Sequence, residues 1–327
     1  MRARFRYGAF MSPLPDRILV TGANGNLGRQ LIGRLCDLSD EDGGTRPMVR
    51  ALVRSETAAA RVRGLPAACP PEVVVGNYTD PDSMRRAMMD CTGVVHLVGI
   101  IKEGRGASYS SAHEETCRVL EAVAADGVCR RIVYLSIFGS HAGAHNSCLK
   151  SKGVAEQILL EGRVPSTIIR VPMVLGPDDF ASASLRAQAQ GRWVALVGGG
   201  RTLQQPIDCR DVVNAIVAAL TDDSRAMLAL DLCGPECLEH RELLARVATL
   251  HGNSPRVIPI PEFLARIFAS ALERISADPP ITRPMLEILH RDDRLDDMPC
   301  CQELGISLTP LSETLRAYAG PEAGRHG

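Results

Sequence analysis

The stretch R-I-L-V-T-G-A-N-G-N-L-G, from Arg17 to Gly28, decides the fold of this chain. Its apolar run ends at Thr21, a helical pattern begins near Asn26, and regularly spaced glycines punctuate the turn between them. Such a turn brings the backbone close to a pyrophosphate and aims the free N–H groups of a helix N-terminus at its charge. The stretch therefore predicts a dinucleotide site, with an ordinary tight strand-to-helix turn as the alternative.

Short apolar runs recur along the chain, with helical patterns such as 107–126 and 152–161 between them. The runs cover residues 17–21, 49–53, 72–76, 93–98, 130–136, 166–171 and 228–232. Runs that are apolar at consecutive positions are typical of strands buried on both faces of a parallel sheet. The alternation predicts an α/β fold with a doubly wound parallel sheet of the Rossmann type, whose ligands lie beyond the carboxyl ends of the strands.

The sequence divides into three predicted parts. Residues 1–15 form a basic N-terminal tail, with Met11 as an alternative start to Met1, and residues 16–176 form the dinucleotide-binding domain. In residues 177–327, glycines and prolines loosen the pattern, which predicts a smaller substrate-side portion interleaved with the last sheet elements. Helices are predicted there over 238–251 and 261–275. Asp211 is predicted to cap a helix over 212–220.

Composition limits the classes of partner. The 327 residues are 45% hydrophobic and 23% charged, with a net charge of −1. A net charge so close to zero does not indicate a basic surface for nucleic acid. No apolar run reaches the roughly 18 residues of a transmembrane helix. The 11 cysteines are scattered without a C-x-x-C pair, so we predict no metal site and favour a reducing compartment. We expect a cytoplasmic protein.

Arg54 follows the second predicted strand, where an NAD site usually places an acidic residue against the ribose 2′-hydroxyl. A guanidinium there would pair with the 2′-phosphate of NADP, so the sequence favours NADP(H) over NAD(H). The alternative is that Arg54 is a solvated loop charge. Asn77, after the third strand, is a candidate ligand of the adenine amino group or a turn residue before Asp80 and Pro81.

Several segments together resemble the extended short-chain dehydrogenase/reductase superfamily. They include T-G-A-N-G-N-L-G, R-A-L-V-R, V-V-H-L-V-G-I, G-V-C-R-R-I-V-Y-L-S-I-F-G and I-I-R-V-P-M-V-L-G-P-D-D. The resemblance spans about residues 17–318 and is strongest to the atypical branch, which includes the nucleotide-binding accessory subunit of respiratory complex I and its bacterial relatives. It implies a dinucleotide, a small-molecule or quinone-like ligand, and a respiratory-chain protein as partner. It also implies peripheral attachment to the inner membrane as the alternative to a cytoplasmic location.

The resemblance also implies where a catalytic site would lie. Catalytic members use a Tyr four residues before a Lys, with a Ser or Thr near the end of the fifth strand, to move a proton to the substrate oxygen. Here Lys152 is in place, but Cys148 occupies the Tyr position, and Ile137 and Phe138 follow Ser136. A thiol is shorter than a phenol by a whole ring, so we interpret Cys148 as a small helix residue, with a reactive thiol as the alternative.

Other candidates remain open. His113 either lines the nicotinamide pocket or caps a helical turn, while His96 is interpreted as a core histidine within its strand. The resemblance places Arg170, Asp178 and Asp179 beside the substrate crevice; an ion pair or a turn is an equal alternative for them.

The residues expected to contact the dinucleotide lie in the glycine-rich turn and at the ends of the later strands. They are Thr21, Gly22, Asn24, Gly25, Asn26, Leu27, Gly28, Arg54, Asn77, Tyr78, Val98, Gly99, Ser136, Lys152 and Pro172. The leading hypothesis is an NADP(H)-binding protein with weak or no hydride-transfer activity, for which Cys148, His113 and Lys152 are weak catalytic candidates. The alternatives are an active NAD(P)-dependent oxidoreductase or epimerase with a substituted acid, and a non-catalytic interaction protein with an empty pocket.

Overall fold

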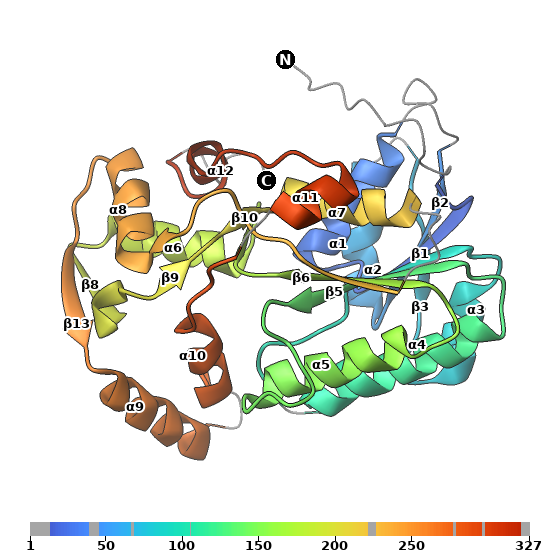
Figure 1. Cartoon of the computed structure of the whole chain (residues 1–327), viewed down its shortest axis with the longest axis horizontal. Helices are drawn as coiled ribbons and strands as arrows, with labels where there is room; N and C mark the ends of the chain where they lie inside the picture. Colours follow the sequence, from blue (N-terminus) through green and yellow to red (C-terminus); the bar gives the residue numbers. More distant parts are fainter. Residues whose placement is uncertain are drawn as a thin grey trace.

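The computed structural model of the chain describes residues 14–38, 46–66, 69–104, 106–221, 227–276, 279–295 and 298–321 (Figure 1). All but the last two residues of the predicted N-terminal tail lie outside these ranges.

A parallel sheet forms the centre of the described structure. Its strands are β1 (Arg17–Thr21), β2 (Met48–Val53), β3 (Glu72–Val75), β4 (Gly93–His96), β5 (Arg131–Ile137), β6 (Ser166–Val171) and β11 (Leu228–Asp231). They lie in the order β3-β2-β1-β4-β5-β6-β11, and every pairing in the sheet is parallel. The order reverses direction between β1 and β4, as in a doubly wound sheet. The predicted fold class is confirmed, and each of the predicted runs is a strand of this sheet.

Helices cover both faces of the sheet (Figure 1). On one face lie α1 (Asn26–Cys36), α2 (Glu56–Arg63), α7 (Cys209–Thr221) and α11 (Met298–Leu304), and on the other α3 (Pro81–Met88), α4 (Thr116–Ala125) and α5 (Ser147–Leu160). In β1, Ile18 and Val20 join the first core and Leu19 joins the second. Because successive side chains of a strand point to opposite faces, an uninterrupted apolar run serves both cores.

Two helical predictions need correction. The pattern over 107–126 is not one α-helix, because a π-helical turn, Ser110–Glu115, precedes α4. Asp211 does not cap α7, which begins two residues earlier, at Cys209. Its buried carboxylate instead accepts hydrogen bonds from the amide and hydroxyl of Thr309, at 2.7 and 2.8 Å. The partner is 98 residues away in the sequence, so local spacing could not reveal it.

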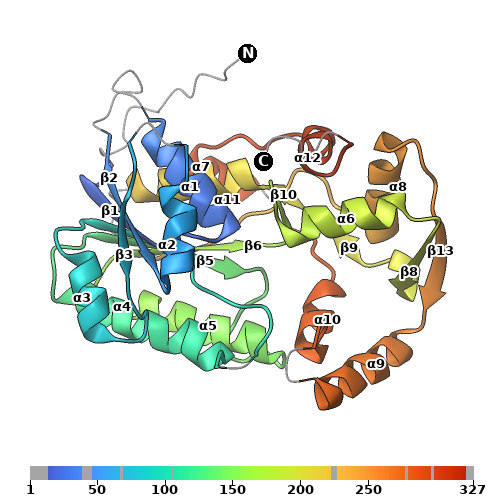
Figure 2. The ribbon, with the colours of Figure 1, turned by 180° about the vertical axis from the view of Figure 1, so that it is seen from behind.

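The C-terminal portion has a core of its own beside the sheet (Figure 2). It packs α6 (Phe180–Gln190), α8 (His240–Leu250) and α12 (Leu311–Tyr318) together. Short strands pair around it: β7 (Val174–Leu175) with β10 (Ile207–Asp208), β9 (Leu203–Gln204) with β12 (Leu238–Glu239), and β8 (Trp193–Val197) with β13 (Arg256–Ile260). The chain then continues through α9 (Glu262–Ile275) and α10 (Arg283–Leu289). Within the described ranges, no helix combines the length and apolar character needed to cross a membrane.

Candidate dinucleotide-binding site

The turn between β1 and α1 is too tight for side chains at two of its glycines. Gly22 has a φ of +68°, and a Cβ there would lie 3.0 Å from the carbonyl carbon of Leu97. A Cβ on Gly28 would lie 2.6 Å from the carbonyl oxygen of Gly22, because α1 packs directly against the turn. The turn therefore needs both a left-handed backbone and a close helix–strand contact, which only glycine permits.

The N-terminus of α1 is open to an anion. Its N-cap residue is Gly25, which has no side chain to accept a hydrogen bond, and its first turn contains no acidic residue. The N–H groups of a first helical turn lack partners within the helix and carry the positive end of its dipole. The turn therefore offers a cradle of backbone donors that fits a pyrophosphate.

Two grooves meet at this turn, along the carboxyl edge of the sheet. The first, of about 400 Å³, includes among its lining the predicted contacts Gly22, Asn24, Gly25, Arg54, Asn77, Tyr78, Val98 and Gly99. The second, of about 260 Å³, includes Gly22, Gly25, Asn26, Leu27 and Gly28. Because two glycines line both grooves, the grooves lie on either side of a single turn. Most of the residues predicted to contact the dinucleotide therefore line one of these two grooves.

Arg54 and Asn77 both line the first groove, and they differ in their exposure and hydrogen bonding. Arg54 is exposed at the end of β2, with its guanidinium available to a ligand. The Asn77 side-chain oxygen accepts hydrogen bonds from the amide and the hydroxyl of Thr79, each at 3.1 Å. The turn role predicted as the alternative for Asn77 is therefore present in the structure, although the residue still lines the groove.

Tyr78 holds the turn in place. Its hydroxyl accepts a hydrogen bond from the Gly22 amide at 3.3 Å and donates one to the Leu52 carbonyl oxygen at 3.1 Å. Burial raises the pKa of this phenol, so the phenol stays protonated and can donate. Tyr78 therefore ties the glycine-rich turn to β2, a role that the sequence did not indicate.

Thr21 faces the interior of the sheet. Its hydroxyl lies 2.7 Å from His96 Nδ1, and His96 Nε2 lies 3.3 Å from the hydroxyl of Thr116. Burial, with the positive charge of Lys152, lowers the pKa of His96 to about 3, so the imidazole is neutral. The interpretation of His96 as a satisfied core histidine agrees with these contacts.

Lys152 is buried beneath the edge of the sheet. Its Nζ donates a hydrogen bond to the Leu135 carbonyl oxygen at 3.0 Å and lies 4.5 Å from the centre of the Tyr134 ring. A Cβ on Gly99 would lie 2.9 Å from the same nitrogen. Burial lowers the pKa of Lys152 to about 8. Gly99, which lines the first groove, therefore lies directly against this ammonium group.

Cys148 and His113 are held by one loop residue. The Cys148 thiol lies 3.6 Å from the carbonyl oxygen of Ile100, and His113 Nε2 accepts a hydrogen bond from the Ile100 amide at 3.1 Å. Burial raises the pKa of Cys148 to about 11 and, with the charge of Lys152, lowers that of His113 to about 3. The thiol is therefore protonated and the imidazole uncharged at neutral pH. Both pKa values therefore lie far from neutral pH, near which a general acid or base works best.

Ser136 is engaged below the site. Its hydroxyl donates a hydrogen bond to the buried carboxylate of Glu156, which also accepts bonds from Nε and Nη2 of Arg170 at 3.0 and 2.6 Å. Arg170 lies 3.6 Å from Asp231 as well. The ion pair predicted as the alternative for Arg170 is thus present. The Ser136 hydroxyl is hydrogen-bonded to Glu156 inside the protein. Glu156 had no assigned role in the sequence, because it lies on α5 while its partners lie on β5 and β6.

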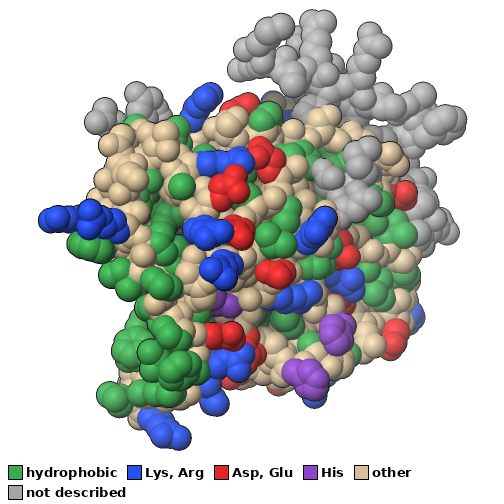
Figure 3. Space-filling view, turned by 60° about the vertical axis from the view of Figure 1, so that its left-hand side comes forward, with side chains coloured by type: hydrophobic (Ala, Val, Ile, Leu, Met, Phe, Trp, Pro, Cys, Tyr) green, Lys and Arg blue, Asp and Glu red, His purple; other side chains and the backbone are tan. Residues whose placement is uncertain are grey.

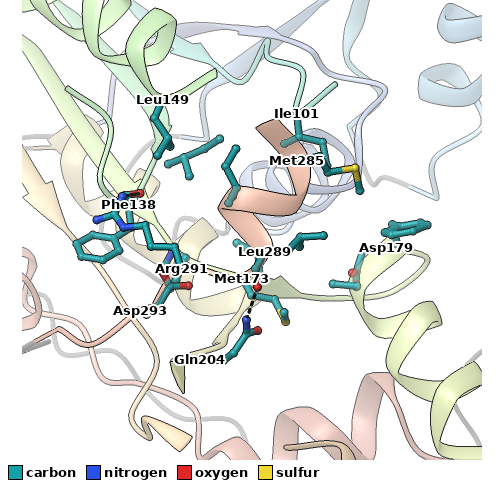
Figure 4. Close-up of a pocket in the computed structure, with 16 residues that line it drawn as sticks. Ile101, Phe138, Leu149, Met173, Asp179, Gln204, Met285, Leu289, Arg291 and Asp293 are labelled. Atoms are coloured by element: carbon teal, nitrogen blue, oxygen red, sulfur yellow. Dashed lines mark hydrogen bonds between the residues drawn. The ribbon is translucent and has the colours of Figure 1, made fainter. Parts of the chain in front are cut away.

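A largely apolar cavity of about 300 Å³ adjoins the second groove, with which it shares Val174 and Asp179 (Figure 4). Asp179 caps α6, accepting from the Ser182 amide at 2.8 Å, so its turn role is present too. The rest of the wall comes from Ile101, Ile137, Phe138, Leu149, Pro172, Met173, Phe180, Ala181, Gln204, Met285, Ile288, Leu289, Arg291 and Asp293. Pro172 therefore lines this cavity rather than either groove.

Arg291 and Asp293 bring charge to the opposite end of the cavity from Asp179 (Figure 4). Arg291 donates to the Phe138 carbonyl oxygen at 3.3 Å and lies over the Phe138 ring. Burial raises the pKa of Asp293 to about 6. The sequence missed both residues, because no motif marks the segment after α10. Among the described residues, no group of three or more His, Cys, Asp or Glu could hold a metal ion.

Comparison with known proteins places the chain in a family. A family model described as NAD(P)H-binding matches residues 22–223, well over half of the 327 residues. The chain therefore belongs to the NAD(P)H-binding family, which confirms the prediction of a dinucleotide-binding family.

Individual relatives are more distant. The chain is 28% identical, over 280 residues, to NADH dehydrogenase (ubiquinone) 1 alpha subcomplex subunit 9 of Arabidopsis thaliana mitochondria, covering 84% of this chain and 67% of that protein. It is 29% identical, over 296 residues, to (4-alkanoyl-5-oxo-2,5-dihydrofuran-3-yl)methyl phosphate reductase of Streptomyces griseus, covering 88% and 92%. A similar solved structure is UDP-glucuronic acid 4-epimerase of Bacillus cereus with UDP-glucuronic acid and NAD. It has a TM-score of 0.70 and 18% identity over 93% of this chain and 98% of that one.

Proposed function

We propose that this protein binds NADP(H) along the two grooves and has weak or no hydride-transfer activity. The observation that carries the proposal is the state of the expected proton donors. The position expected for a tyrosine is a buried, protonated cysteine, and the Ser136 hydroxyl is bonded to Glu156. A bound nicotinamide would supply a hydride, but the chain has no group at these positions to protonate the substrate oxygen.

The surrounding residues support a binding role. The cradle at the start of α1 would hold the pyrophosphate, Arg54 the 2′-phosphate, and the second groove would lead toward the apolar cavity. The cavity fits an apolar ligand such as a quinone-like molecule or an acyl chain. The Arabidopsis relative is named as a subunit of a respiratory NADH dehydrogenase, so a respiratory-chain protein and peripheral attachment at the inner membrane belong to the same proposal.

Replacing Arg54 with alanine is expected to weaken NADPH binding roughly tenfold to a hundredfold and to leave NADH binding nearly unchanged. A charge-assisted hydrogen bond to a phosphate contributes about 1.5–3 kcal/mol, and NADH lacks the 2′-phosphate. Isothermal titration calorimetry with both nucleotides measures the difference. Arg61→Ala, an exposed arginine on the neighbouring α2, is the matched control and should change neither affinity. An equal loss of affinity for both nucleotides would mean that Arg54 attracts any anionic ligand and does not select the 2′-phosphate. No binding heat with either nucleotide, for the native protein, would favour an empty pocket.

Cys148→Ala is expected to leave the rate of NADPH oxidation with carbonyl or quinone substrates at the same low level as in the native protein. The buried thiol has a pKa of about 11 and is a poor acid, so its removal takes away no proton donor. Cys148→Tyr restores a phenol beside Lys152 and is expected to raise the rate, provided that its melting temperature shows it folded. The measurement is the decrease in NADPH absorbance over time, compared with protein without substrate.

The alternative is an active oxidoreductase with a substituted acid, and one observation favours it. Asp293 lines the cavity with a pKa raised to about 6, so part of it is protonated near neutral pH. Substantial native turnover that falls as pH rises through about 6, and that is lost in Asp293→Asn, would establish this alternative. Turnover that Cys148→Ala removes would instead identify the thiol as the acid.

A further inference from the structure

Helix α9 exposes several large apolar side chains along one face. Phe263, Ile267 and Phe268 are each 62% exposed, Leu264 is 47% exposed and Ile275 is 84% exposed. These five side chains are here called the α9 face. Figure 3 shows apolar side chains gathered at the lower left, over α9. In the described structure, Ala269 is the buried residue that anchors the helix. Clusters of large exposed apolar side chains mark surfaces that bind something.

The charge around the α9 face is positive. The α9 face belongs to segment 256–283 of the sequence, and segment 192–201 adjoins it because β8 pairs with β13, which leads into α9. In the sequence they carry six arginines against the carboxylates of Glu262, Glu273 and Asp278, a net charge of +3 in a chain whose total is −1. Within the same region the guanidinium of Arg256 lies 5.3 Å from the centre of the half-exposed Trp193 ring.

We propose that the α9 face binds the surface of a membrane that contains anionic lipid, an inference that rests on the peripheral membrane attachment proposed above and assigns it a surface. A helix with large apolar side chains on one face and arginines beside it lies in the plane of a lipid interface. Each arginine near an anionic surface adds about 1 kcal/mol of attraction. Trp and Arg together are suited to the headgroup level, where one end of a side chain is apolar and the other is wet.

A second copy of the chain fits this face less well. A two-fold contact would place the same patch on both partners and bring a net charge of +3 against itself. An anionic membrane neutralises that charge instead. Helix α10 lies next to α9, because Arg283 at the start of α10 forms an ion pair with Glu273 of α9 at 2.8 Å. The helix that supplies Met285 and Leu289 to the apolar cavity therefore lies next to the proposed lipid contact.

Flotation of the full-length protein with phosphatidylcholine vesicles, with and without phosphatidylglycerol, tests the proposal. We expect binding to the anionic vesicles, and at least tenfold weaker binding, roughly, for the triple variant Phe263→Ser, Ile267→Ser and Phe268→Ser. Added salt and Arg274→Gln should each weaken binding several-fold, about the effect of losing one charge contact. The control is Met89→Ser with Val128→Ser, two exposed apolar side chains, 62% and 57%, outside this region.

The possible results separate cleanly. Failure of the native protein to bind either vesicle, or unchanged binding by the triple variant, overturns the proposal. A native dimer that the triple variant converts to a monomer would assign the α9 face to a second copy of the chain. NADPH affinity, measured on the same samples, should be the same for all variants. A loss of vesicle binding is thereby distinguished from a failure of the nucleotide site.

Discussion

Gly28→Ala is expected to weaken NADPH binding by tenfold to a hundredfold, roughly, and to lower the free energy of unfolding by about 1–3 kcal/mol. The added Cβ would lie 2.6 Å from the carbonyl oxygen of Gly22 and 2.8 Å from both the Cα and the carbonyl oxygen of Ala23. All three are backbone atoms, so no side-chain rotation can relieve the contact. Helix α1 must move away from the turn, and the donors at its N-terminus move with it.

Gly33→Ala is the matched control for this prediction. Gly33 lies on the same helix, and a Cβ there meets nothing within 4 Å. Alanine inside a helix is favoured over glycine by about 0.5–1 kcal/mol, so this variant should be slightly more stable and bind NADPH normally. Calorimetry and urea unfolding compare the two variants. Normal binding by a folded Gly28→Ala protein would show that the close packing of α1 does not set the nucleotide cradle.

The central sheet was predictable because its signal is local. In β1 and β5, consecutive apolar residues are buried, and such a run indicates a strand covered on both faces without information from the rest of the chain. The glycine-rich turn is equally local, since the steric demand on Gly28 comes from residues five and six positions earlier. The π-helical turn before α4 was missed because its residues have ordinary helical spacing.

The remainder of the site depends on contacts between distant residues. Tyr78 reaches Gly22 across 56 positions, and Arg291 reaches Phe138 across 153. No pattern in a short window reports such pairs. The expected roles of Ser136 and Asn77 illustrate the same limit, because each was placed correctly at the end of its strand. Their side chains then bond to Glu156 and Thr79, which the position alone could not reveal.

Glu156→Gln is expected to lower the free energy of unfolding by about 3 kcal/mol, at the lower end of the cost of breaking a buried ion pair. Glu156 is 2% exposed, and its carboxylate accepts hydrogen bonds from three donor groups, two nitrogens of Arg170 and the hydroxyl of Ser136. An amide removes the negative charge and leaves the Arg170 guanidinium with Asp231 alone, at 3.6 Å. The loss should therefore loosen the carboxyl ends of β5 and β6, which carry residues of the groove and the cavity.

Urea unfolding of two further variants identifies the cause. Glu56→Gln breaks the exposed pair with Arg63 and should cost no more than about 0.5 kcal/mol, because water screens that pair. Glu156→Met combined with Arg170→Met removes both charges and should recover most of the loss, since the main cost of the single change is an uncompensated charge. A double variant no more stable than Glu156→Gln would mean that the hydrogen bond to Ser136, and not the ion pair, holds these strands together.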